Sequence, residues 1–172
     1  MGLGRVGPHI GLRDDRRRAV RTSADRLRSS DTQAQIRDTQ ARETRQRVDQ
    51  YLARLNHVEF LPLVAAASDL LNTEPINQAE ALRAWLDGES VDRLRTLAFL
   101  NFFEEVAGQY NAGTLDEEAA NRELVPTAVH YWEIGGWFIG RLQKNQPTAF
   151  NQWREMVSGL RLADLIADKP AS

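Results

Sequence analysis

Residues 91–111, VDRLRTLAFLNFFEEVAGQYN, carry the clearest helical pattern in the chain. Large apolar side chains fall there at positions i, i+3, i+4, i+7 and i+11, namely Phe99, Phe102, Phe103, Val106 and Tyr110. This spacing puts them in one stripe, as in a helix that packs a single face into a core. Ser90 stands just before the segment, and serine is a favoured N-cap. We therefore expect a helix over residues 91–111.

Apolar residues recur at helical spacing on both sides of this segment. Thr114 and Glu117 form a capping-box signature for the next helix. The other expected boundaries lie at residues that cap or interrupt helices: Pro62, Asn77, Gly88, Pro126 and Thr148. No alternating strand pattern of useful length is present. The predicted fold class is all-α, an antiparallel helical bundle over residues 51–165 with an extended, basic N-terminal helix.

The N-terminal part of the sequence has a different character. We expect residues 1–25 to be disordered, residues 26–50 to form an exposed polar helix, and residues 166–172 to form a flexible tail. The tetrapeptide at residues 31–34, DTQA, returns at residues 38–41, and Ala34, Ala41 and Val48 form a thin apolar seam. A stable coiled coil needs apolar positions sustained over several heptads, so the seam supports at most a weak one.

Charge divides the sequence in the same way. Residues 1–54 hold 13 of the 22 basic side chains, all arginine, against 7 acidic ones, whereas the remainder holds 9 basic and 17 acidic ones. The chain has no cysteine, which excludes disulfides and thiolate metal ligands. No export signal or bilayer-spanning segment is readable, so we expect a cytoplasmic protein without a membrane span.

The segment LNFFEEVA at residues 100–107, followed by Tyr110, Gly113 and Leu115-Asp116, resembles a bacterial family catalogued as domain of unknown function 4760. Tyr131-Trp132, Phe138-Ile139 and Arg141 match its downstream helix, and the resemblance covers about residues 50–160. It implies a helical domain and no established activity. Many members carry a transmembrane helix before the domain, where this sequence has its arginines instead, so membrane anchoring is not carried over.

The sharpest polar constellation is Asn101, Glu104, Glu105 and Gly108, at i, i+3, i+4 and i+7. These residues share the face opposite the phenylalanine stripe. They form either a groove for a partner or a cation, or the solvated side of an amphipathic helix. Two adjacent carboxylates without a paired base are a poor catalytic signal, which favours the second interpretation.

Histidine and glycine give weaker signals. His130 and Glu133 share a helix face, but zinc needs three or four converging ligands, so we expect no metal site and no cofactor. Gly136 and Gly140 lie one turn apart inside a predicted helix. We expect them to allow close packing within the bundle, with a dimer contact beside Trp137 as the alternative.

The arginine-rich N-terminus suggests contact with a partner, and its candidate residues are Arg16, Arg17, Arg18, Arg42 and Arg45. No nucleophile can be assembled with an attendant base, so we expect no enzyme. The leading hypothesis is a non-enzymatic protein-interaction module with an unidentified protein partner. The alternatives are a nucleic-acid-associated accessory protein, which interspersed acidic residues disfavour, and a small-ligand or metal-binding domain. A homo-oligomer stays open.

Overall fold

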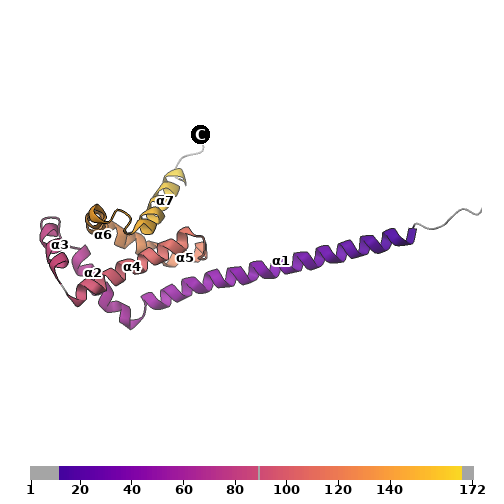
Figure 1. Ribbon diagram of the computed structural model, residues 1–172, viewed down its shortest axis with the longest axis horizontal. Coiled ribbons are helices and arrows are strands. Elements are labelled where there is room, and N and C mark those ends of the chain that lie inside the picture. The colour runs from indigo at the N-terminus through magenta and orange to yellow at the C-terminus, as the bar shows by residue number, and fades with distance from the viewer. Residues whose placement is uncertain (1–11, 89, 168–172) are drawn as a thin grey trace, which may run out of the picture. The chain divides into compact units, whose positions relative to one another are not determined.

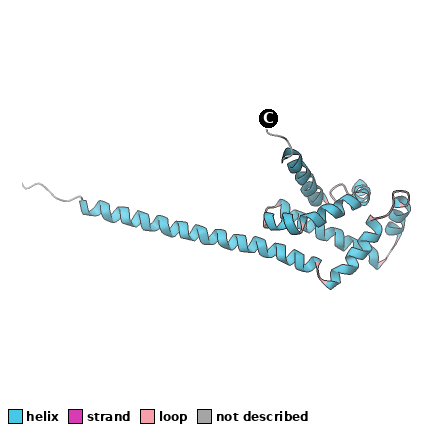
Figure 2. Cartoon of the chain, turned by 180° about the vertical axis from the view of Figure 1, so that it is seen from behind, coloured by secondary structure: helices cyan, strands magenta, loops and turns pink. Residues whose placement is uncertain are grey.

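The protein is described from a computed structural model, which covers residues 12–88 and 90–167, with side chains for 31–88 and 90–161. Within that part of the chain every regular element is a helix and no strand occurs (Figure 2). The all-α prediction is confirmed. The elements are α1 (Leu12–Leu55), η1 (Val58–Phe60, a 3₁₀ turn), α2 (Leu61–Leu71), α3 (Gln78–Asp87), α4 (Val91–Asn111), α5 (Glu117–Glu123), α6 (Val125–Asn145) and α7 (Asn151–Ala167).

Two compact units divide the chain, residues 1–42 and residues 43–172. We call the first the arm and the second the body. The body therefore begins inside α1, earlier than the expected residue 51, because the last turns of this helix pack on the body. Val48 is fully buried and joins the core cluster. The backbone N–H of Asp116 also donates to the carbonyl of Thr44 (3.3 Å).

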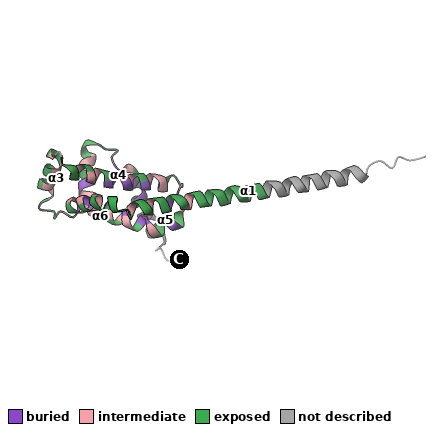
Figure 3. Cartoon of the chain, turned by 90° about the horizontal axis from the view of Figure 1, so that it is seen from below, coloured by how far each residue is buried: buried purple, intermediate pink, exposed green. Residues whose placement is uncertain are grey.

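Helix α4 supplies the largest part of the body's core. Its stripe of Phe99, Phe102, Phe103 and Val106 is at most 1% exposed, as the sequence pattern predicted. Helices α2 and α7 pack on α4, and α6 contacts α2, α5 and α7 (Figure 1). Buried positions gather on these inward faces (Figure 3). The body is therefore a bundle of helices arranged around α4.

Aromatic rings fill much of this core. Phe60 at the end of η1 lies 4.8 Å from the Phe102 ring, and Phe103 stacks on Trp153 of α7 at 5.1 Å between ring centroids. The indole N–H of Trp153 donates to the carbonyl of Ala128 (3.0 Å), which satisfies a buried polar atom. The rings thereby connect η1, α4, α6 and α7 in one continuous cluster.

Helix α1 begins at Leu12 in the structure, whereas the sequence pattern predicted disorder to residue 25 and a helix from residue 26. Arginine, alanine and leucine have high intrinsic helix propensity, which accounts for the earlier start. The expected disorder of residues 1–11 concerns residues outside the described part. The expected tail begins at residue 166, yet α7 continues to Ala167, and residues 168–172 are also outside that part.

Candidate functional site

Glu104, from the polar face of α4, binds the first turn of α7. Its Oε1 accepts the backbone N–H of Gln152 (3.1 Å) and its Oε2 accepts that of Trp153 (2.9 Å). The first N–H groups of a helix have no partner within the helix, and a carboxylate also complements the positive end of the helix dipole. Glu104 therefore caps α7 from a different helix.

The neighbouring Glu105 joins α4 to the end of α1. It accepts a hydrogen bond from the Tyr51 hydroxyl (2.9 Å) and pairs with Arg54 (3.1 Å). The Arg54 guanidinium also lies 5.1 Å from the centroid of the Phe102 ring. Burial, together with the hydrogen bond to Glu105, raises the pKa of Tyr51 to about 12. Glu105 therefore stabilises the junction between α1 and the bundle.

The other two members of the constellation have separate environments. A Cβ added at Gly108 would lie 3.7 Å from Cγ of Gln152, so this glycine faces α7 at ordinary contact distance. Asn101 is exposed and borders a cavity that Glu104 also lines. The structure thus uses Glu104 and Glu105 for contacts between helices and leaves Asn101 at the rim of a cavity.

This cavity, which we call the Trp85 pocket, has a volume of about 430 Å³. A stripe of α4 at i, i+4, i+8 and i+11 forms one wall with Arg93, Leu97, Asn101 and Glu104, and Trp85 of α3 and Phe150 also line the pocket. Volumes of about 300–1,000 Å³ with mainly apolar lining and a few polar groups are typical of small-molecule sites. The pocket has the size and the composition of such a site.

Two irregular features occur at the Trp85 pocket. Phe150 has φ = 56°, and within the described chain it is the only residue other than glycine with a positive φ. The indole N–H of Trp85 is buried, and no atom of the described chain accepts a hydrogen bond from it. Oδ1 of Asn151, the residue after Phe150, is also buried and receives no hydrogen bond from the described chain. Unsatisfied buried polar atoms and left-handed non-glycine residues are each unfavourable, and such strain clusters at functional sites.

Among the candidate arginines, Arg45 is bound to the body. Its Nη2 contacts Glu123 Oε1 and Asp49 Oδ1, both at 3.2 Å. Hydrogen bonds from Arg122 and Arg45 hold the pKa of Glu123 below its ordinary value, and the bond to Glu123 raises the pKa of Arg45. Among the described residues Arg42 pairs with Asp38 (3.9 Å), and both side chains are exposed. Arg16, Arg17 and Arg18 lie within α1, and their side chains are outside the described set.

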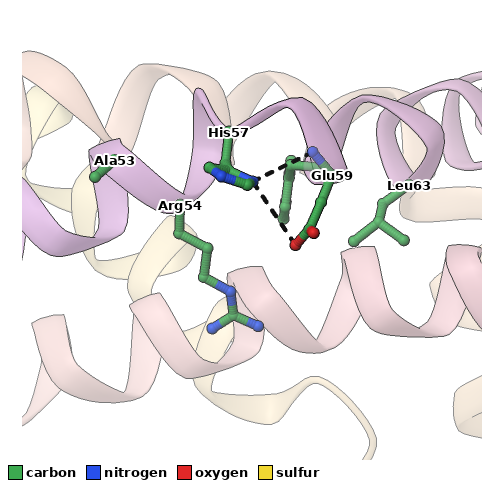
Figure 4. A pocket seen from close by; sticks show the side chains of 6 residues that line it. Ala53, Arg54, His57, Glu59 and Leu63 are labelled. Atoms are coloured by element: carbon green, nitrogen blue, oxygen red, sulfur yellow. Dashed lines mark hydrogen bonds and ion pairs between the residues drawn. The ribbon is translucent and has the colours of Figure 1, made fainter.

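The two histidines that the structure describes, His57 and His130, lie in separate environments. His130 is exposed, and Glu133 pairs with Arg161 (3.2 Å). His57 caps η1, because its Nδ1 accepts the N–H of Glu59 (3.3 Å). Figure 4 shows these two side chains turned toward each other in an open pocket of about 490 Å³, with Arg54 pointing away from them. No group of three or more ligating side chains occurs among the residues described.

The close packing predicted at Gly136 and Gly140 is wrong. A Cβ at either position would meet nothing within 4 Å, whereas one at Gly135 would lie 3.3 Å from both methyl carbons of Leu71. Gly135 is buried and Gly140 is exposed. The i, i+4 pair is turned away from the packed face of α6, and the residue next to it makes the close approach to α2.

Comparison with models of known protein families, with characterised proteins and with solved structures gave no match. No helix in the described part of the chain is long and apolar enough to span a bilayer. Of the residues that line the Trp85 pocket, the sequence indicated Asn101 and Glu104 as candidates but not Arg93, Trp85 or Phe150. The i, i+4, i+8 spacing of Arg93, Leu97 and Asn101 was a readable signal, whereas the contribution of Phe150 depends on tertiary structure.

Proposed function

We propose that this chain is a non-enzymatic protein-interaction module whose arm recruits a protein partner. One observation carries the proposal: residues 31–42 are helical and every one of them is exposed (Figure 3). Most helices in proteins owe their stability to packing of an apolar face, and this segment has no such packing. A helical surface that contributes little to the fold is well suited to contact another molecule.

The chemistry of the arm favours a polar protein surface that carries charges of both signs as the partner. The arm contains ten arginines and five aspartates, and Ile36 is a large apolar side chain that is 52% exposed. Arginine with an adjacent apolar side chain is a frequent composition of protein interfaces. The aspartates lie among the arginines, so a partner surface with charges of both signs fits better than a uniform one.

The test is recovery of the partner from native lysate by three forms of the protein. The full chain is compared with a truncation that begins at Glu43 and with the double variant Arg37→Glu, Arg42→Glu. We expect the full chain to retain a partner that the other two forms lose. Arg141→Glu, which changes an exposed arginine of the body, is the matched control and should retain the partner. Equal recovery by the truncation would assign recognition to the body and contradict the proposal.

Nucleic acid is the second candidate partner, because ten arginines fall within 42 residues. Nuclease treatment of the lysate and titration of salt distinguish it from a protein. Binding through phosphate contacts weakens by orders of magnitude between about 50 and 200 mM salt. A partner that survives nuclease, with modest dependence on salt, supports the protein-interaction proposal, and a partner lost under both treatments supports the alternative.

A further inference from the structure

The Trp85 pocket has one cationic group with unused hydrogen-bonding capacity. Nη1 of Arg93 donates to the carbonyls of Leu86 (2.9 Å) and Gly88 (3.4 Å), and the guanidinium carbon lies 5.0 Å from the centroid of the Trp85 ring. No described residue accepts from its Nε or Nη2. An arginine carries five N–H donors, and the edge formed by Nε and Nη2 matches the geometry of a carboxylate or a phosphate.

Among the residues that the structure describes, Glu104 is the one carboxylate that lines the pocket, and it is distant from Arg93 and already bound. Glu104 lies eleven positions further along α4, which corresponds to about 16 Å of helix rise. Both of its oxygens accept N–H groups from the first turn of α7. An anion held at Arg93 is therefore not repelled at close range by Glu104. One end of the pocket carries the cationic Arg93, and the other end carries the anionic Glu104.

The lining beside Arg93 suits a flat apolar molecule. Trp85 is held by the edge-to-face contact of its ring with Phe138 (4.9 Å) and by the guanidinium of Arg93. Leu97 and Phe150 add apolar surface. Phe150 is only 7% exposed, and its backbone lies in the unfavourable left-handed region. Such a conformation persists only where the surrounding structure holds it, so the ring is fixed in place.

We infer that the Trp85 pocket binds a small organic anion that has a planar apolar body and a single anionic group. The anionic group contacts the Nε and Nη2 edge of Arg93, and the apolar body contacts Trp85, Leu97 and Phe150. This site is separate from the arm. A failed recruitment experiment therefore leaves it unaffected, and failure here leaves the recruitment proposal intact.

The test uses two fluorescent probes with the same apolar body and the full-length protein. One is 8-anilinonaphthalene-1-sulfonate, which is anionic, and the other is the neutral N-phenyl-1-naphthylamine. We expect one saturable site that binds the anionic probe at least about tenfold more tightly, as one charge-assisted hydrogen bond provides. Arg93→Gln should abolish this preference. Arg95→Gln, on the same helix and paired with Asp92 (2.9 Å), is the control and should keep it.

A second variant locates the probe independently of Arg93, which also holds the carbonyls at the end of α3. Ala149 lines the pocket and is half-buried, so Ala149→Phe fills the cavity. Loss of both probes in an Ala149→Phe protein with an unchanged circular dichroism spectrum supports the site. Undiminished binding in that variant, or equal affinity of the two probes for the unmodified protein, overturns the inference.

Discussion

At the scale of single residues, the polar face of α4 stabilises contacts between helices. A carboxylate that caps a helix from outside needs only two hydrogen bonds, and Glu104 makes both of them to α7. The same face carries Asn101, whose side chain has no hydrogen-bond partner among the described residues. Glu104 therefore contributes to the stability of the fold, whereas Asn101, three positions before it, contributes little.

Replacing Glu104 with alanine should lower the free energy of unfolding by about 1–2 kcal/mol, because two N–H groups of α7 lose their acceptor. Asn101→Ala should change it by less than about 0.5 kcal/mol. Urea denaturation followed by circular dichroism measures both. Equal effects of the two substitutions would show that Glu104 does not act as a cap.

The glycines of α6 give a second prediction. Gly136→Ala should raise the free energy of unfolding by about 0.5–1 kcal/mol, because it removes unfolded-state entropy and the new methyl group meets no atom. Gly135→Ala should be less favourable, since the methyl group would push against Leu71. Thermal denaturation of both variants provides the comparison. Destabilisation by Gly136→Ala would instead indicate that another molecule covers this face.

Tyr51 provides a prediction on pH. Its pKa of about 12 in the folded protein exceeds the value of about 10 expected for an unfolded chain. The folded state therefore binds the phenolic proton more tightly, and this contribution to stability is complete below pH 10 and lost as the pH rises toward 12. In a titration of tyrosinate absorbance, Tyr51→Phe should remove amplitude from the late part of the curve, near pH 12. Loss of amplitude near pH 10 in this variant, with the late part of the curve unchanged, would contradict the assignment.

At the scale of elements, the boundary between arm and body lies inside one continuous helix. The division falls after residue 42, and in the turns of α1 that belong to the body Arg47 donates to the Thr114 carbonyl (3.1 Å) and Arg45 pairs with Glu123. A helix can therefore serve two units, with residues 31–42 exposed and its last turns packed.

Two truncations test this boundary. A protein that begins at Glu43 should keep the free energy of unfolding of the full chain to within about 0.5 kcal/mol, since the removed side chains that the structure describes, residues 31–42, are all exposed. A protein that begins at Val48 should be less stable, by about 1–3 kcal/mol, because it loses Thr44, Arg45 and Arg47. Urea denaturation of the full chain and the two truncations measures these differences in the free energy of unfolding. Equal stability of both truncations would move the boundary to Val48.

The sequence predicted the elements whose signals are local. The stripe of α4 and the Ser90 cap, which accepts the N–H of Arg93 (3.3 Å), need only neighbouring residues, and both predictions are confirmed. The Thr114 capping box was wrong, because Asp116 caps α5 while Thr114 bonds the Gln109 carbonyl at the end of α4 (2.9 Å). An orphan carbonyl from the preceding helix competed for the same hydroxyl.

The start of α7 shows why the rest could not be predicted. Thr148 was expected to cap this helix, yet α7 begins at Asn151 and its acceptor is Glu104, 48 positions before Gln152. No local pattern encodes such a partner. For the same reason the sequence indicated Asn101 and Glu104 as one polar face but could not place Phe150 beside them in a pocket.

At the scale of the whole molecule, the two units differ in charge and in the burial of their side chains. The arm has ten arginines against five aspartates, whereas the chain after residue 54 has an excess of acidic side chains. The body holds the core, and the described side chains of the arm are exposed. We therefore propose that the body supplies stability and the arm supplies recognition.

A photo-crosslinking amino acid at Ile36 tests the central claim most directly, since this side chain is exposed in the arm. Irradiation in the native cell should give a crosslinked product that is sensitive to protease and resistant to nuclease. The product should disappear when Arg37 and Arg42 are changed to glutamate. A nuclease-sensitive product, or no product at Ile36 while the same group at Leu94 of the body captures a protein, would contradict recruitment of a protein by the arm.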